Sequence, residues 1–161
     1  MRVTMSPQFA EVFRKNYLVT GLDDSTVGEI AELAEVGSLM AGACLIDKGD
    51  DSSDLFVILD GTVQVYTKRG NKLGDCGPGS VLGEVSLVDA GPRSANVMCL
   101  GSVTYAKLPA AELRRYMTEN KEAGFTMLAN LSRVLSMRLR KSAEVMEDLR
   151  AQTVDPWEHA L

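Results

Sequence analysis

The residues with the clearest potential for chemistry lie in segment 79–95, GSVLGEVSLVDAGPRSA. A predicted strand end at Val81–Leu82 runs into Gly83, and a short helix is expected to begin at Glu84. Helix starts leave backbone N–H groups unpaired and carry a partial positive charge, so they bind anions. Arg93 comes nine residues after Glu84 and can return to the same pocket to pair with a phosphate. A carboxylate beside a bound anion is explained if the ligand also carries hydroxyl groups, as a ribose does.

A simpler interpretation of the same residues needs no ligand. Gly83 could be a turn glycine, and Glu84 and Arg93 could form an ordinary salt bridge. The context favours the binding site. The segment comes late in a glycine-rich region of short strands, directly before another predicted strand, and Pro92-Arg93-Ser94-Ala95 is complete.

Composition argues against several other functions. The single histidine, His159, lies near the end of the 161 residues, whereas a Ser-His-Asp triad or a cupin-type metal site needs histidine in an ordered core. We therefore expect a non-enzymatic protein with no catalytic residue, metal or cofactor. The cysteines at 44, 76 and 99 are too few and too widely spaced for a disulfide framework or a zinc site, and reduced thiols indicate a cytoplasmic protein.

Charge and hydropathy limit the partners. The net charge of −5 argues against a general nucleic-acid or anionic-membrane surface. No apolar run approaches the roughly 18 residues that a membrane span needs. Residues 1–10 lack the apolar region of a secretory signal.

The elements that must position segment 79–95 are short strands. Between Leu39 and Leu108, glycines interrupt apolar runs at intervals of about eight to twelve residues, a spacing typical of an antiparallel barrel or jelly roll. The clearest predicted strands are 55–59, 62–66, 95–100 and 103–106. The polar run 68–72 is expected to be a solvated hairpin tip.

Helices are expected on both sides of this region. A cap at Ser6-Pro7 begins a short helix to about Asn16, and a second helix starts at Asp24 and ends at Gly37. After a helix over 110–118, a long helix should run from about 123 to 152. Its apolar residues recur in a heptad stripe, in which Arg138 occupies one position. A helix with such a stripe commonly pairs with a second copy of the chain along it. The apolar and small residues of this stripe are Leu128, Leu131, Leu135, Ser142, Val145 and Leu149.

Together these motifs resemble the phosphate-binding cassette of cyclic nucleotide-binding domains, most of all the bacterial catabolite activator (cAMP receptor) family. The likeness rests on Gly49-Asp50, on LFVILDGTV at 55–63, on LGEVSL at 82–87, on Arg93-Ser94-Ala95 and on the long terminal helix. The resemblance implies an α+β, mainly β fold: an eight-stranded antiparallel, jelly-roll-like β-roll with short N-terminal helices and a long C-terminal dimerisation helix. The expected boundaries are 1–122 for the β-roll with its flanking helices, 123–155 for the long helix and 156–161 for a tail.

The resemblance also implies a role for each site residue. Glu84 would take the ribose 2′-hydroxyl, Arg93 the cyclic phosphate, and Ser94 would add a phosphate bond. Arg138 would reach toward Glu84, and Ser142 would face the purine edge. Alternatively, Arg138 extends to solvent and Ser142 is a small residue at a helix crossing. The full predicted ligand-binding set is Val63, Leu73, Leu82, Gly83, Glu84, Val85, Ser86, Arg93, Ser94, Ala95, Arg138 and Ser142.

We predict from this resemblance a stand-alone regulatory sensor that binds cAMP, dimerises through its terminal helix and acts on a partner protein. Only nine residues follow Gln152, so no helix-turn-helix domain and no DNA-binding role are expected. Ala143 stands where the activator offers a second hydroxyl, which leaves the choice between cAMP and cGMP open. Two alternatives remain: a pocket that binds another ligand such as cGMP or cyclic di-GMP, and a structural or dimerisation module whose pocket is not functional.

Overall fold

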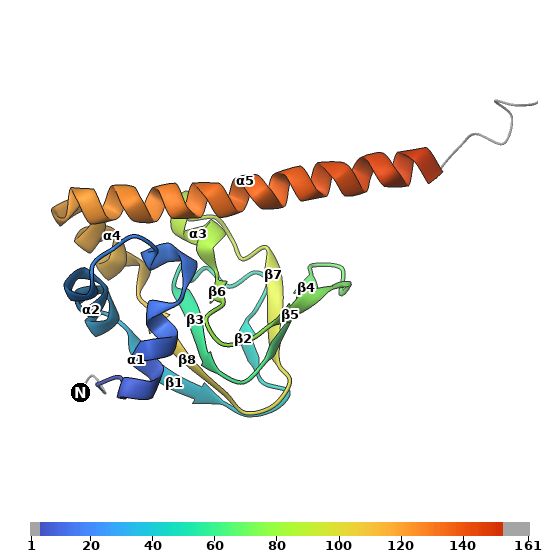
Figure 1. Ribbon diagram of the computed structural model, residues 1–161. Helices are drawn as coiled ribbons and strands as arrows, with labels where there is room; N and C mark the ends of the chain where they lie inside the picture. Colours follow the sequence, from blue (N-terminus) through green and yellow to red (C-terminus); the bar gives the residue numbers. More distant parts are fainter. Residues whose placement is uncertain (1–3, 153–161) are drawn as a thin grey trace, which may run out of the picture.

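Two antiparallel four-stranded sheets form the centre of the computed structural model, which describes residues 4–152 (Figure 1). One sheet has the order β1 (Glu35–Leu39), β8 (Val103–Leu108), β3 (Leu55–Asp60) and β6 (Val81–Leu82). The other has the order β2 (Cys44–Ile46), β7 (Ala95–Cys99), β4 (Val63–Thr67) and β5 (Lys72–Cys76). The predicted eight-stranded β-roll is confirmed.

Burial in β3 explains how the core is divided. Residues Leu55 to Leu59 are all buried, so this strand is covered on both faces, unlike a strand with one face in water. Phe56 and Ile58 pack between the two sheets, whereas Leu55 and Val57 pack against the helices. β6 is the edge strand beside β3 and both of its residues are buried, so the chain leaves the core directly at Gly83.

The N-terminal helical segments cover the outer face of the first sheet. They are α1 (Pro7–Arg14), the 3₁₀ turn η1 (Tyr17–Val19) and α2 (Asp24–Glu32). Ser6 caps α1 and Asp23 caps α2, each accepting a backbone N–H with its side-chain oxygen. The first cap was expected from the sequence.

Gly37 corrects the predicted end of the second helix. α2 ends at Glu32, and Gly37 lies within β1, opposite Tyr105 of β8. A Cβ on Gly37 would lie 2.5 Å from the Tyr105 ring. The glycine therefore admits an aromatic ring from the neighbouring strand and is not a helix stop.

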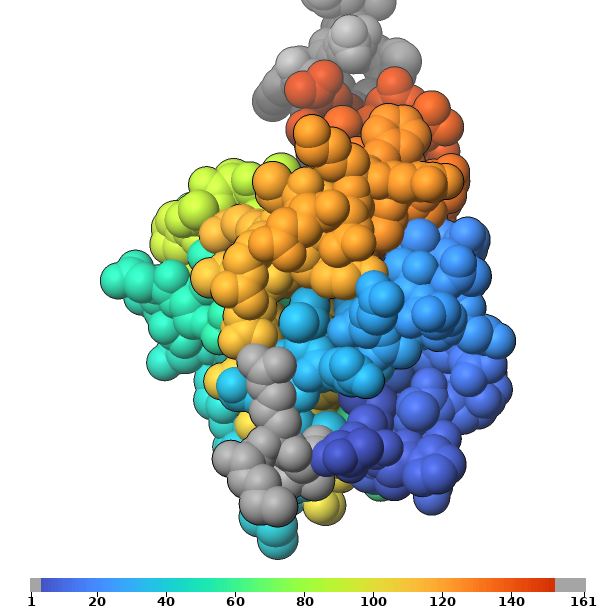
Figure 2. Space-filling view, turned by 90° about the vertical axis from the view of Figure 1, so that its left-hand side faces the viewer, coloured from blue at the N-terminus to red at the C-terminus, as the bar shows by residue number. Residues whose placement is uncertain are grey.

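Two further helices follow the β-roll, α4 (Ala110–Glu119) and α5 (Lys121–Gln152). Both were predicted, with α5 beginning two residues earlier than expected. Figure 2 shows α4 and the start of α5, in orange, lying against the N-terminal helical segments in blue. The Asn130 amide of α5 donates to the carbonyls of Leu18 and Thr20 at 2.9 Å each, which fixes η1 to α5.

The second half of α5 runs past the β-roll (Figure 1). Leu131 is buried in the core and Arg138 pairs with Glu84, so two positions of the predicted stripe face this chain's own fold. A neighbouring face of α5 instead exposes Phe125, Leu128, Leu139 and Met146. Three residues of the predicted stripe, Leu128, Val145 and Leu149, are also exposed, and pairing through this stripe stays a prediction. Pro156, His159 and the predicted tail lie outside the described residues.

Within residues 4–152, no helix combines the length and the apolar character that crossing a membrane requires. The hairpin tip at 68–70 forms a turn, as expected.

Candidate functional site

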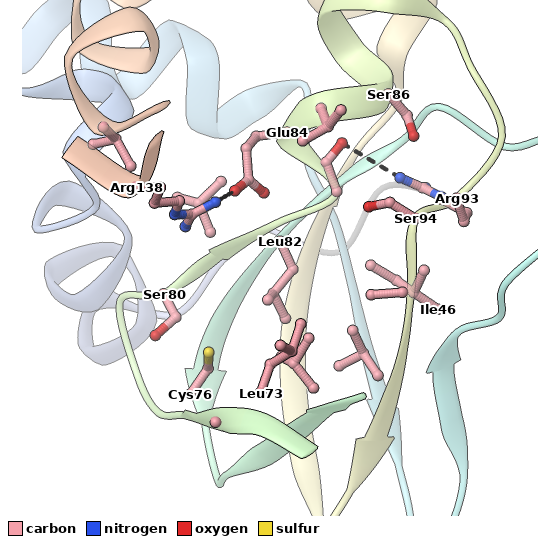
Figure 3. A pocket seen from close by; sticks show the side chains of 18 of the residues that line it. Ile46, Leu73, Cys76, Ser80, Leu82, Glu84, Ser86, Arg93, Ser94 and Arg138 are labelled. Atoms are coloured by element: carbon pink, nitrogen blue, oxygen red, sulfur yellow. Dashed lines mark hydrogen bonds and ion pairs between the residues drawn. The ribbon is translucent and has the colours of Figure 1, made fainter. Parts of the chain in front are cut away.

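A cavity of about 510 Å³ lies between the β-roll, η1 and α5. This volume is within the range of about 300–1,000 Å³ that is typical of small-molecule sites. Figure 3 shows Ser86, Arg93 and Ser94 on one side, Glu84 and Arg138 across from them, and Leu73 and Cys76 toward the other end. The lining residues are Tyr17, Ile46, Val65, Leu73, Gly74, Cys76, Ser80, Val81, Leu82, Gly83, Glu84, Val85, Ser86, Arg93, Ser94, Ala95, Val97, Val134 and Arg138.

Gly83 makes the sharp turn between β6 and α3 (Glu84–Asp89). Its φ of 83° lies in the left-handed region, which costs a residue with a side chain but not glycine. A Cβ at this position would lie 2.5 Å from Arg93 Nη1 and 2.8 Å from the Asp54 carbonyl oxygen. Glycine is therefore required both for the turn and for the close approach of Arg93.

Arg93 is the buried cation of the site, with only 2% of its surface exposed. Its Nη2 donates to the Asp54 carbonyl at 2.6 Å and to Ser52 Oγ at 3.5 Å, and its Nη1 donates to the Gly83 carbonyl at 3.4 Å. Among the described residues, no carboxylate lies within ion-pair distance of the guanidinium. Its Nε is buried and has no hydrogen-bond partner in the same part of the chain.

The surroundings of Arg93 favour a negative ligand. Burial lowers the pKa of the guanidinium, while the charges of Asp50, Asp54 and Glu84 act in the opposite direction. The guanidinium carbon lies 5.9 Å from the centre of the Phe56 ring, close enough for a cation–π contact. An arginine remains protonated even when buried, so the positive charge persists. A buried charge without an ionic partner is costly, and an anion in the cavity would remove that cost.

Glu84 is the buried anion across the cavity, and its partner comes from a distant element. Its side chain is 6% exposed and forms an ion pair with Arg138 of α5, whose own side chain remains about half exposed. The structure thus brings Arg138 to Glu84. The pair connects the first residue of α3 to the long helix.

α3 is held from its other side by Arg114 of α4. The Arg114 guanidinium donates to the carbonyls of Ser86 and Leu87 at distances of 2.9 to 3.3 Å. α3 has only six residues, and so short a helix has little stability of its own. The fixed position of this short helix therefore depends on its neighbours.

The other end of the cavity is mainly apolar. Ile46, Val65, Leu82 and Val97 supply aliphatic side chains, and Leu73 of β5 lies at the edge, 66% exposed. Such a surface suits the flat faces of a heterocyclic base. The polar groups at this end are Cys76 and Ser80, and burial raises the pKa of the Cys76 thiol, so it is not a thiolate at neutral pH.

Two predicted site residues lie elsewhere. Val63 is fully buried between the sheets, and Val65, which points to the same side of β4, lines the cavity instead. Ser142 is exposed and does not line the cavity, and its hydroxyl donates to the Arg138 carbonyl at 3.0 Å. The other ten predicted residues all line the cavity.

The residues that sequence reasoning missed divide into two groups. Val134 precedes Arg138 by one helical turn and could have been inferred from the helix period. Tyr17, Cys76 and Ile46 reach the cavity only through the packing of η1, β5 and β2, and no motif marks them. Ser80 lies within segment 79–95 and could have been inferred from that motif.

Comparisons with known proteins agree with this geometry. A model of the cyclic nucleotide-binding domain family matches residues 36–120. The crystal structure of the N-terminal domain of a transcriptional regulator from Streptomyces coelicolor A3(2) is 31% identical, with a TM-score of 0.70, and the match covers 83% of this chain and 95% of that one.

Two curated relatives match over most of the chain. The CRP-like cAMP-activated global transcriptional regulator of Mycobacterium tuberculosis is 24% identical over 143 residues, which are 86% of this chain and 62% of the relative. Glutaminase 2 of Bradyrhizobium diazoefficiens is 29% identical over 122 residues, which are 76% of this chain and 19% of that enzyme. The chain thus spans less than two thirds of either relative. Since the family match includes more than half of its residues and all but one of its strands begin within that match, the chain belongs to the cyclic nucleotide-binding domain family.

Proposed function

We propose that this chain is a regulatory module that binds cAMP in the cavity between the β-roll and α5. The observation that carries the proposal is Arg93, a buried guanidinium whose Nε has no partner and which faces no carboxylate within ion-pair distance in residues 4–152. A cyclic phosphodiester carries one negative charge and acceptor oxygens, which would complete this environment. The choice of a cyclic nucleotide is supported by the family, and the choice of cAMP by the name of the mycobacterial relative.

The cavity suggests how such a ligand would lie. Its phosphate would contact Arg93 and the hydroxyl of Ser94, and its 2′-hydroxyl would donate to Glu84. The base would extend along the aliphatic surface between Val65, Leu82 and Val97. In this orientation each part of the ligand meets a group of complementary chemistry.

Binding at Glu84 offers a route from the ligand to α5. The Glu84 carboxylate already pairs with Arg138, so a sugar hydroxyl that engages Glu84 changes the ion pair that ties α3 to α5. A ligand shifts a conformational equilibrium only through such differential contacts. We propose that the position of α5 is the output and that a partner protein recognises it.

We also propose that α5 forms a homodimer. The exposed apolar residues Phe125, Leu128, Leu139 and Met146 recur at spacings that keep them on one helix face, and Leu135 and Ser142 continue the same heptad. This face borders the one that packs on the β-roll, and Leu135 contributes to both. Pairing with a second copy would cover it.

Calorimetric titration of the intact chain with cAMP, cGMP, cyclic di-GMP and 5′-AMP tests the ligand assignment. We expect cAMP to bind most tightly and 5′-AMP much more weakly, because its open phosphate has a different shape and charge. A parallel melting experiment should show a stabilisation of about 2.7 kcal/mol when cAMP exceeds its dissociation constant a hundredfold. If none of the four ligands produces heat or stabilisation, the cavity is not a cyclic nucleotide site.

A further inference from the structure

Tyr17 places a second unsatisfied polar group in the cavity. This residue lines the cavity, and its hydroxyl oxygen is buried without a hydrogen-bond partner among residues 4–152. Buried tyrosine hydroxyls usually find a partner, because an unmade hydrogen bond is costly. With the Nε of Arg93, this hydroxyl completes the set of buried side-chain polar atoms without partners in the described residues, and both groups border the same cavity.

The backbone of Tyr17 is held firmly in place. Asn16 caps η1 by accepting the Leu18 N–H at 3.0 Å, and its amide donates to the Phe13 carbonyl at 2.6 Å. Asn130 of α5 binds the Leu18 and Thr20 carbonyls on the other side. The turn is therefore anchored to both α1 and α5, which fixes the backbone from which the Tyr17 side chain extends.

Two charged residues that line the same cavity, Glu84 and Arg138, act on the phenol. Burial raises the pKa of Tyr17 well above its usual range, with the Glu84 carboxylate adding to the rise and Arg138 opposing it. Tyr17, Glu84 and Arg138 all line the same cavity. At neutral pH the phenol is protonated and can donate a hydrogen bond.

We propose that Tyr17 is a sugar-recognition residue, whose hydroxyl donates to the oxygen of the ligand's 2′-hydroxyl while that hydroxyl donates to Glu84. A ribose hydroxyl can accept and donate at the same time, so one group satisfies both protein partners. This assignment rests on the proposed function, because it requires a cyclic ribonucleotide in the cavity. It extends ligand recognition to the N-terminal turn and lets the chain distinguish ribose from deoxyribose.

The test compares Tyr17→Phe with the matched control Tyr116→Phe in calorimetric titrations against cAMP and 2′-deoxy-cAMP. The Tyr116 hydroxyl donates to Glu29 at 2.7 Å on the surface, outside the cavity. We expect Tyr17→Phe to weaken cAMP binding about three- to tenfold, the size of one hydrogen bond, and to leave 2′-deoxy-cAMP binding unchanged. Tyr116→Phe should bind both ligands as the unmodified chain does.

Thermal melting without ligand supplies a second readout. Tyr17→Phe removes an oxygen that has no partner, so the unliganded melting temperature should stay the same or rise. Equal cAMP affinities for Tyr17→Phe and the unmodified chain would overturn the inference while leaving the proposed function intact. An equal loss for both ligands would overturn the assignment to the 2′-hydroxyl. Failure of the unmodified chain to bind any cyclic nucleotide would instead overturn the proposed function itself.

Discussion

Arg93 and Gly83 show how closely binding and local geometry depend on each other at the residue scale. Arg93 can lie beneath α3 only because position 83 has no side chain, and the carbonyls of Gly83 and Asp54 then accept its N–H groups. These neutral partners satisfy part of the guanidinium but supply no countercharge. The buried Nε has no partner among residues 4–152, so the guanidinium keeps a free donor for an anion.

Gly83→Ala should lower stability by more than the cost of placing an alanine in the left-handed region. An alanine in the left-handed region costs about 1–2 kcal/mol of stability, and the new methyl group would also displace Arg93 or the Asp54 carbonyl. Gly70→Ala is the matched control, since Gly70 has a φ of 85° and open space around it. Chemical denaturation should show a loss about 1–3 kcal/mol larger for Gly83→Ala, and calorimetry should show weaker cAMP binding only for this variant. Equal behaviour of the two variants would contradict the packing argument.

Glu84 and Arg93, two ionic groups of the site, could be predicted from the sequence. They lie with Gly83 in one short segment that has a recognisable spacing. Val63 does not line the cavity and Val65 does, because strand periodicity alone does not tell which of two inward positions reaches a cavity. Tyr17 was missed for a different reason: its contact depends on how η1 packs against α5, which local patterns do not encode.

At the scale of elements, α3 is a short helix that three neighbours hold in position. Glu84 at its start is tied to α5, Arg93 lies under the preceding turn, and Arg114 of α4 binds two of its carbonyls. A six-residue helix has little stability of its own. Its placement, and with it the shape of the phosphate end of the cavity, therefore depends on α4 and α5.

Arg114→Ala should consequently weaken cAMP binding, although Arg114 does not line the cavity. Loss of its bonds to the Ser86 and Leu87 carbonyls should loosen α3, lower stability by about 1 kcal/mol and weaken cAMP binding several-fold. Arg115→Ala removes the same charge from the neighbouring exposed position and serves as the control. Melting curves and calorimetry of both variants measure the difference. Unchanged cAMP affinity in Arg114→Ala would show that α4 does not position α3.

Most elements could be predicted from caps, glycine spacing and helix periodicity, and the exceptions have physical causes. The second helix was extended to Gly37 because a glycine after an apolar helical pattern usually marks a helix end. Here the glycine makes room for Tyr105 of the adjacent strand, a long-range contact. The predicted heptad stripe lies on a single long helix, but one of its residues, Leu131, packs into the core of this chain.

At the scale of the whole molecule, α5 presents different faces to different partners. One face closes the cavity through Val134 and Arg138, and a neighbouring face exposes a row of apolar side chains. If the second face forms the dimer, a change at the ligand is transmitted to the interface through a single rigid helix. This arrangement could not be settled from the heptad pattern, because the two faces share residues such as Leu135.

Leu139→Glu should break this dimer. Leu139 is 72% exposed on the proposed interface, and a buried glutamate would carry an unpaired charge there. Met137→Glu is the matched control, because Met137 is similarly exposed on the opposite side of α5. Sedimentation velocity should give a dimer for the unmodified chain and for Met137→Glu, and a monomer for Leu139→Glu. A dimer that survives Leu139→Glu but not Met137→Glu would place the interface on the other face.

The central claim is that the buried guanidinium of Arg93 receives the phosphate of a cyclic nucleotide. Calorimetric titration of cAMP into Arg93→Ala tests it most directly, with Arg93→Lys as a second variant that keeps the charge. Arg69→Ala is an exposed control that does not line the cavity. Melting curves recorded without ligand verify that each variant is folded.

The account predicts a loss of about 2–5 kcal/mol of binding free energy for Arg93→Ala. It predicts a smaller loss for Arg93→Lys, which cannot reproduce the planar fork of donors, and none for Arg69→Ala. A folded Arg93→Ala variant that binds cAMP as tightly as the unmodified chain would contradict the claim.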